Sequence, residues 1–352
     1  MSTESIPLSF LSIFSLISFF VFLIIKKFSV RIGNGVLLDQ DFYKPQAFHK
    51  QAVVRSGGLA GIISLIIFFI LYYFLFQKIL VDYLTLSTAV FLLGFSEDIK
   101  FKMGPNNRLT LMIVILLFFI TYFSVDIQAV DLSFLEMWMQ SRLFVTLFVL
   151  LCFLFIINGA NLIDGFDGLL TIHLLIINSI ILFINVSNNH VEFAILIAAQ
   201  IIILFCFLLF NFPKANMFLG DSGSYLFGSL TALNMIETNN LNIQISSFFF
   251  CILFFYLFFE VFFSFFRKIL QKKSPLLPDQ NHLHMLVYKR LEKNSTSKNN
   301  NYLTALSVNI GYLILILPGI YFMENPLISR YWFFILLAFY TLFYLRLRKL
   351  NK

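Results

Sequence analysis

Long apolar runs alternate with short polar stretches along almost the whole chain. A helix needs about 20 mainly apolar residues to cross the hydrocarbon of a bilayer, and we predict membrane-spanning helices at eleven runs near that length. These runs are Leu8–Ile25, Leu59–Phe76, Ile79–Gly94, Leu109–Phe123, Leu143–Ile157, Leu169–Ile184, Phe193–Phe210, Tyr225–Ile236, Ile245–Phe266, Leu303–Phe322 and Tyr331–Leu345. The run Tyr225–Ile236 is short, and its helix is expected to begin earlier, near Gly223. The first run is interpreted as a retained helix and not a signal peptide, because no basic residue precedes it and no small-residue cleavage site follows it.

The composition agrees with this pattern. Of the 352 residues, 59% are hydrophobic and only 12% are charged, whereas a soluble domain carries about 25% charged residues. We therefore expect an all-α integral membrane protein that forms a single polytopic domain over residues 1–352. The three cysteines lie within apolar runs, so neither a disulfide framework nor a cysteine metal site is indicated.

Lysine and arginine residues give the chain an orientation, because they concentrate in cytoplasmic loops. If the N-terminus lies outside and the spans alternate, the C-terminus is cytoplasmic. All but three of the 25 Lys and Arg residues then fall on the cytoplasmic side, the exceptions being Lys78, Arg142 and Arg330. The net charge of +7 largely reflects this bias and implies no nucleic-acid partner.

The polar motifs follow the same division. Segments 44–58, 94–108, 158–168, 211–224 and 267–301 all fall on the predicted cytoplasmic side, and the outer loops show no comparable arrangement. A transporter would hold its substrate near the bilayer midplane, and a purely structural subunit would not need several acidic motifs at one face. The placement therefore favours an enzyme over these two alternatives.

The stretch "NGANLIDGFDGLL" places Asn158, Asn161, Asp164 and Asp167 three residues apart. If the helix that ends near Ile157 continues, residues at this spacing lie on roughly one face. Ionisable groups at membrane depth usually serve function. The alternative is a polar helix end in which an Asp caps the next helix.

Two further motifs carry carboxylates. In "GFSEDIKFKMGPNNRL", Glu97 and Asp98 are adjacent and Arg108 follows ten residues later. Adjacent carboxylates repel unless a cation or a proton offsets them, and Mg²⁺ suits oxygen ligands; the alternative is a solvated loop of mixed charge. In "MFLGDSGSYLFG", Asp221 lies between glycines before an apolar helix, where backbone N–H groups suit a phosphate, although Asp221 could be only an N-cap.

The segment "SPLLPDQNHLHMLVYKR" carries Asp279, His282 and His284, and it follows a basic stretch that contains Arg267. Two histidines at this spacing share a side in an extended segment but not on a helix. The alternatives are solvated or structural histidines, and basic residues that anchor the loop to lipid headgroups.

The first cytoplasmic motif, "KPQAFHKQAVVRSGGLAG", places His49, Lys50 and Arg55 ahead of paired glycines and a helix. These cations could bind a phosphate or merely enforce orientation. Together, the five motifs place carboxylates, amides, imidazoles and cations at one membrane face. Phosphoryl transfer needs such a set, because its catalysis is mainly positioning and charge neutralisation.

Taken in order over about residues 44–290, the motifs resemble those of the polyprenyl-phosphate N-acetylhexosamine-1-phosphate transferase superfamily, glycosyl transferase family 4. The resemblance implies that a sugar-1-phosphate, expected to be N-acetylhexosamine-1-phosphate, passes from a UDP-sugar to undecaprenyl phosphate and that UMP leaves. The reaction would take place at the cytoplasmic face of the bacterial inner membrane. The product would be the first lipid-linked intermediate of a cell-surface polysaccharide. Mg²⁺ is the implied cofactor, with Mn²⁺ as an alternative, and a homodimer is left open.

The resemblance also implies roles for individual residues. Asp98, Asp164 and Asp221 match catalytic positions; Asp221 and Asp98 would hold the metal, and Asp98 is also the candidate general base for the lipid phosphate. Substrate-binding positions are His49, Lys50, Arg55, Glu97, Arg108, Asn158, Asn161, Asp167, Arg267, Asp279, His282 and His284.

The chain departs from the family pattern at two positions. The acidic pair usually reads Asp-Asp, so Glu97 puts a metal role for its own side chain in doubt. Met285 stands where the histidine loop often has a further His, which favours the branch that starts surface glycans over the phospho-MurNAc-pentapeptide translocase. Glu260 lies inside the ninth span and is expected to face protein or a polar groove, with a structural role.

Overall fold

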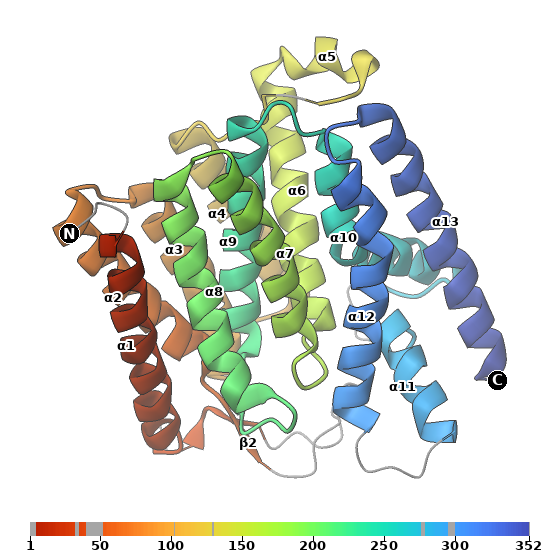
Figure 1. Cartoon of the computed structure of the whole chain (residues 1–352). Coiled ribbons are helices and arrows are strands. Elements are labelled where there is room, and N and C mark those ends of the chain that lie inside the picture. The colour runs from red at the N-terminus through yellow and green to blue at the C-terminus, as the bar shows by residue number, and fades with distance from the viewer. Residues whose placement is uncertain are drawn as a thin grey trace.

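The computed structural model describes residues 5–31, 35–39, 52–101, 103–128, 130–275, 279–294 and 300–351. Over these residues it is a bundle of long helices that run between two ends (Figure 1). The long helices are α1 (Ser5–Ser29), α2 (Gly57–Phe76), α3 (Val81–Asp98), α4 (Pro105–Tyr122), α6 (Arg142–Ile163), α7 (Leu169–Ser187), α8 (Val191–Asn211), α9 (Gly220–Leu241), α10 (Ser247–Leu270), α12 (Asn300–Tyr321) and α13 (Pro326–Leu350). Each of the eleven predicted runs falls, within two residues, in a separate one of these helices, which confirms the all-α membrane architecture.

Within the described residues, nine helices are long and apolar enough to cross a membrane by length and composition. The other two long helices, α3 and α9, are more polar. Helix α9 is buried along most of its length and contacts α2, α3, α6 and α7. A helix enclosed by other helices need not be apolar all round, because its polar side chains face protein and not lipid.

Buried amides and hydroxyls hold α9 in place. On α7, Asn178 donates a hydrogen bond to Thr231 Oγ1 of α9 (2.9 Å), and seven residues later Asn185 donates to Thr238 Oγ1 (2.8 Å). Between these rungs, Asn234 of α9 donates to Asn178 Oδ1 (3.1 Å). Because polar groups in a membrane need partners inside the protein, this ladder fixes the position of α9 and of its N-terminus.

A small sheet lies at the end of the bundle that also holds the polar motifs. Strand β1 (Leu38–Asp39) pairs antiparallel with β2 (Val53–Arg55), and β2 pairs parallel with β3 (Met217–Phe218). In addition, the Gly58 N–H donates to Leu219 O (2.8 Å). These bonds attach the chain just ahead of α9 to the start of α2.

Two short helices lie outside the predicted spans. Helix α5 (Ser133–Met139) is in the predicted outer loop, and α11 (Leu283–Asn294) is in the predicted histidine loop. Helix α9 begins at Gly220, even earlier than expected, so Asp221 lies in its first turn and not ahead of it.

Candidate active site at one end of the helix bundle

Asp221 stands at the centre of a polar cluster formed by the ends of four helices. Its Oδ1 accepts a hydrogen bond from Asn161 Nδ2 of α6 (3.0 Å), and its Oδ2 lies 3.5 Å from Arg108 Nη1 of α4. Asn161 also donates to Ser224 Oγ on α9 (3.0 Å). The Asp221 side chain is 26% exposed. It is therefore both fixed in direction and open to a ligand.

Asp98, the last residue of α3, accepts hydrogen bonds from Asp221 and from the residue after it. One carboxylate oxygen accepts from the Asp221 N–H (3.0 Å), and the other accepts from the Ser222 N–H (3.0 Å) and the Ser222 hydroxyl. The side chain is 2% exposed. Asp98 thus caps the N-terminus of α9 from a neighbouring helix, where a negative charge is stabilised by orphan N–H groups and the helix dipole.

Gly220 makes this cap possible. Its φ is +79°, a left-handed conformation that residues with side chains rarely adopt. A Cβ at this position would stand 2.6 Å from Asp98 Oδ2. The glycine that precedes Asp221 is therefore required both by the turn and by the carboxylate packed against it.

The two side chains of the acidic pair point to different partners. Asp98 faces α9, whereas Glu97 Oε2 lies 3.9 Å from Arg108 Nη1. Arg108 thus stands between Glu97 and Asp221. Arg108 therefore contacts one member of the acidic pair, Glu97, together with Asp221, and its role in substrate binding stays a prediction.

The predicted stripe on "NGANLIDGFDGLL" is only partly formed. Helix α6 continues to Ile163, as the spacing required, and Asn161 reaches Asp221. Asn158, by contrast, donates back to Leu154 O of its own helix (2.7 Å). Asp167 accepts from the Ala215 N–H (3.1 Å) and so ties its loop to the segment that leads to α9. The four polar side chains therefore do not share one face, because the helix ends before the last two.

Asp164 lies directly after α6 and is half-buried. Burial and the negative charge of Asp221 together raise the pKa of the carboxyl to about 8. The catalytic role of Asp164 that the resemblance implied stays a prediction. An excess of negative charge here favours a bound proton or cation.

Arg55 pairs with a residue that the sequence did not suggest. Both Nε (3.0 Å) and Nη2 (2.6 Å) donate to Asp39 Oδ2 across the β1–β2 pair, and Asp39 is buried. No motif marked this aspartate, because strands of two and three residues leave little signal in a sequence. His49 and Lys50, which were predicted to bind substrate, lie outside the described residues.

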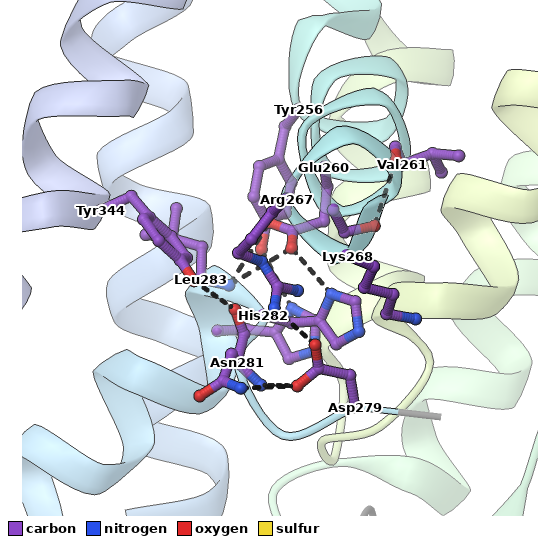
Figure 2. A network of polar contacts seen from close by, with 12 residues as sticks. Tyr256, Glu260, Val261, Arg267, Lys268, Asp279, Asn281, His282, Leu283 and Tyr344 are labelled. Carbon is purple, nitrogen blue, oxygen red and sulfur yellow. Dashed lines mark hydrogen bonds and ion pairs between the residues drawn. The ribbon is translucent and has the colours of Figure 1, made fainter. Parts of the chain in front are cut away.

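The histidine segment is held at two points by α10 (Figure 2). His282 Nδ1 lies 2.9 Å from Glu260 Oε1 of α10, and Arg267 Nη1 donates to Asp279 Oδ2. Burial alone would raise the pKa of Asp279, but the hydrogen bond and charge of Arg267 lower it overall. Glu260 faces protein, as expected for a carboxylate within a membrane span.

Both histidines are buried, with His282 2% and His284 0% exposed, but they have different partners. His284 lies in the first turn of α11, so the segment is not extended over both residues, which is a correction to the extended arrangement considered above. It is fully buried, with Tyr256 OH 3.3 Å from its Nδ1 and the Phe166 ring edge-on. Burial lowers the pKa of His284 to about 3, which keeps the ring neutral. In this structure His284 packs inside the protein, and its predicted contact with substrate stays a prediction.

Phe166 joins the two halves of the site. It belongs to the loop between Asp164 and Asp167, and its ring contacts His284 (5.8 Å between centroids) and Tyr288 of α11 (5.3 Å). The histidine segment therefore lies against the loop of the second carboxylate motif. Segments more than 100 residues apart in the chain meet at one end of the bundle.

The side chains near Asp221 indicate how the predicted Mg²⁺ could be held. Among the described residues, no group of three or more His, Cys, Asp or Glu side chains could hold a metal ion, and both oxygens of Asp98 are bonded to α9. The described residues therefore form no all-protein cage, and the metal role of Asp98, whose oxygens accept from α9, stays a prediction. Mg²⁺, however, commonly takes one or two carboxylates and completes its coordination with water and substrate phosphates. Asp221 fits that mode.

The fold and site define a class: a multi-pass helical membrane protein with an acidic, phosphate-compatible site at one membrane face. The family model "Glycosyl transferase family 4" matches residues 80–239, which include Asp98, Arg108, Asn161, Asp164 and Asp221. The match leaves the histidine segment outside.

Similar proteins agree with this family. The undecaprenyl-phosphate alpha-N-acetylglucosaminyl 1-phosphate transferase of Thermotoga maritima is 26% identical over 250 residues, which cover 70% of this chain and 71% of that protein. The phospho-N-acetylmuramoyl-pentapeptide-transferase of Dictyoglomus turgidum is 29% identical over 237 residues, 63% of this chain and 74% of the other. That of Leuconostoc mesenteroides is 42% identical over 98 residues, 28% and 29% of the two chains. The chain is thus similar to glycosyl transferase family 4 over residues 80–239 and to these transferases over most of its length, and it is a multi-pass protein of the inner membrane.

Proposed function

We propose that the protein transfers N-acetylhexosamine-1-phosphate from a UDP-sugar to undecaprenyl phosphate and releases UMP. The product would be the first lipid-linked intermediate of a cell-surface polysaccharide. One observation carries the proposal: Asp221, oriented by Asn161 and by the cap from Asp98, faces Arg108 at the N-terminus of α9. The names of the similar proteins support the same reaction class.

The reaction joins a phosphate oxygen of the lipid to the sugar-linked phosphorus of the donor and breaks the bond between that phosphorus and the UMP oxygen. Arg108 would hold the negative charge of the donor phosphates, as arginine does for phosphate groups. Asp221 would hold Mg²⁺ on the diphosphate, and the ion would neutralise charge there. Asn161 would keep the Asp221 carboxylate pointed at it.

Asp98 takes a positioning role in this proposal. Its oxygens accept three hydrogen bonds from the first turn of α9, so its most direct effect is to hold Asp221 in place. Its predicted role as general base for the lipid phosphate stays a prediction. Action as a base would require the carboxylate to leave this cap.

The starting sugar separates two branches. Position 285, where the pentapeptide translocase branch often has a histidine, is a Met that is 1% exposed. A packed methionine supplies no charge or hydrogen-bond donor to a substrate. This favours an N-acetylhexosamine donor over the UDP-MurNAc-pentapeptide of peptidoglycan synthesis.

The test uses purified protein in detergent with Mg²⁺ and undecaprenyl phosphate. UDP-GlcNAc, UDP-GalNAc and UDP-MurNAc-pentapeptide, each labelled in the sugar, are offered separately, and label in the lipid phase is followed. Asp221→Asn should abolish transfer, whereas Asp82→Asn, at the opposite end of α3, should leave it intact. Transfer from the pentapeptide donor alone would move the protein to the other branch. Absence of transfer from every donor by folded protein would refute the function.

A further inference from the structure

Glu260 is a carboxylate buried inside a membrane helix, and its contacts are specific. It is 1% exposed. Its Oε1 lies 2.9 Å from His282 Nδ1, and its Oε2 accepts from the hydroxyl of Tyr340 on α13. The Leu283 N–H, the first of α11, points at both oxygens (3.3 and 3.4 Å). A buried charge is tolerated only where donors satisfy it, and here these donors come from three separate elements.

A second rung lies one heptad further along α10. Arg267 pairs with Asp279, and Asp279 Oδ1 accepts from the backbone N–H (2.8 Å) and side chain (2.7 Å) of Asn281. Tyr344, one turn after Tyr340 on α13, donates to Asn281 O (3.0 Å). Residues 279–283 are therefore bonded to α10 at both ends of the segment and to α13 at Asn281 (Figure 2).

The contact with Glu260 decides which ring nitrogen of His282 is available. A carboxylate accepts only, so the nitrogen it faces must carry the proton. With Nδ1–H directed at Glu260, Nε2 keeps its lone pair and can only accept a hydrogen bond from a ligand. In this arrangement a carboxylate fixes the tautomer and direction of an imidazole that acts elsewhere.

We propose that Glu260, itself oriented by Tyr340, is a positioning residue that holds the Nδ1 proton of His282 and keeps Nε2 as a hydrogen-bond acceptor for a hydroxyl group of the nucleotide sugar. The substrate half of this statement rests on the proposed function; the tautomer half does not. The proposal also gives α13 a part in the site, although that helix lies outside the matched family region.

The first experiment is ¹⁵N NMR of histidine side chains in the full-length protein, labelled at His and held in detergent micelles. The chain has five histidines, and the spectrum of His282→Gln assigns the resonances of His282. The wild type should show His282 protonated at Nδ1. In Glu260→Gln the amide can donate as well as accept, so the Nε2–H form should appear. A wild type with Nε2–H only, or a His282 spectrum unchanged by Glu260→Gln, would overturn the proposal.

Tyrosine variants provide a matched control. Tyr340→Phe removes a donor to Glu260 and should shift the His282 resonances while Nδ1 stays protonated. Tyr256→Phe lies in the same cluster but contacts His284, so it should leave His282 unchanged. Equal effects of the two variants would show a general packing effect and would contradict the proposal. Tyr340→Phe also keeps the test decisive if Glu260→Gln does not fold.

The second experiment is a double-mutant cycle on kcat/KM for UMP release. Misplacement of a group in a site by about 1 Å can cost about 100-fold, so Glu260→Gln should lower kcat/KM by roughly that factor. In the His282→Gln background the same change should cost less than about twofold, because residues that act as a unit are not additive. Additive losses would refute action through His282. If the wild type transfers no sugar, the proposed function fails, while the NMR result still tests the tautomer.

Discussion

Replacement of Gly220 by Ala tests whether the Asp98 cap positions Asp221. Gly220 has a φ of +79°, and the left-handed conformation costs a residue with a side chain about 1–2 kcal/mol. The new Cβ would stand 2.6 Å from Asp98 Oδ2, where contacts are ordinary only beyond 3.4 Å. The carboxylate must therefore retreat by several tenths of an ångström, or the turn must open.

Either movement weakens the bonds from Asp98 to the first turn of α9. A hydrogen bond to a charged group contributes about 1.5–3 kcal/mol. Loss of one such bond, added to the backbone strain, gives roughly 2.5–5 kcal/mol of destabilisation. Asp221 would move with the turn, and a shift near 1 Å should lower kcat by about 100-fold.

The assay measures UMP release together with thermal inactivation in detergent. Gly165→Ala is the control, since Gly165 lies in the loop after Asp164 with nothing within 4 Å of its added Cβ. We expect Gly220→Ala to inactivate at a clearly lower temperature and to lose activity, while Gly165→Ala behaves as wild type. If Gly220→Ala matches Gly165→Ala in both measurements, the cap does not control Asp221 and the argument is wrong.

Three further predictions follow from the same contacts. Asn161→Ala removes the 3.0 Å hydrogen bond to Asp221. A hydrogen bond to a charged group contributes about 1.5–3 kcal/mol, so kcat/KM should fall by roughly 10- to 100-fold. A change below twofold in the UMP assay would contradict the claim that Asn161 orients Asp221. The pKa of Asp164 is raised to about 8, so the population of its charged form grows as pH rises through that value. Because cation binding displaces the proton, the Mg²⁺ concentration needed for half-maximal activity should fall as pH rises. If this dependence on pH is unchanged in Asp164→Asn, the effect belongs to another group. Arg267→Ala leaves Asp279, whose side chain is 10% exposed, without its cation. The change should lower stability by about 3–5 kcal/mol, seen as thermal inactivation at a lower temperature, and the double change of Arg267 and Asp279 to Leu should lower it less. Equal losses in the two variants would show that the unpaired charge is not the cause.

The membrane architecture could be predicted from the sequence because bilayer thickness sets the length of each apolar run. The gathering of the motifs at one end also followed, since alternating spans bring every second loop to the same side. Asp98, Asn161 and Arg108 accordingly meet at Asp221, although they come from different helices. These outcomes depend on length and order alone.

The directions of side chains could not be predicted in the same way. Nothing in "SED" indicates that Asp98 turns to cap α9 while Glu97 turns to Arg108. The burial of His284 and the contact of Tyr340 with Glu260 depend on how α11 and α13 pack against α10. Such contacts join residues tens of positions apart, and no local spacing encodes them.

The central claim is transfer of a sugar-1-phosphate to a lipid phosphate, and the stoichiometry of its products tests it most directly. UDP-sugar labelled in the β-phosphate and in the sugar is incubated with the protein, Mg²⁺ and undecaprenyl phosphate. We predict that both labels enter the lipid phase together and that UMP forms in an equal amount, with loss of both products in Asp221→Asn. Release of UDP, with the sugar label but not the phosphate label in the lipid, would contradict the account.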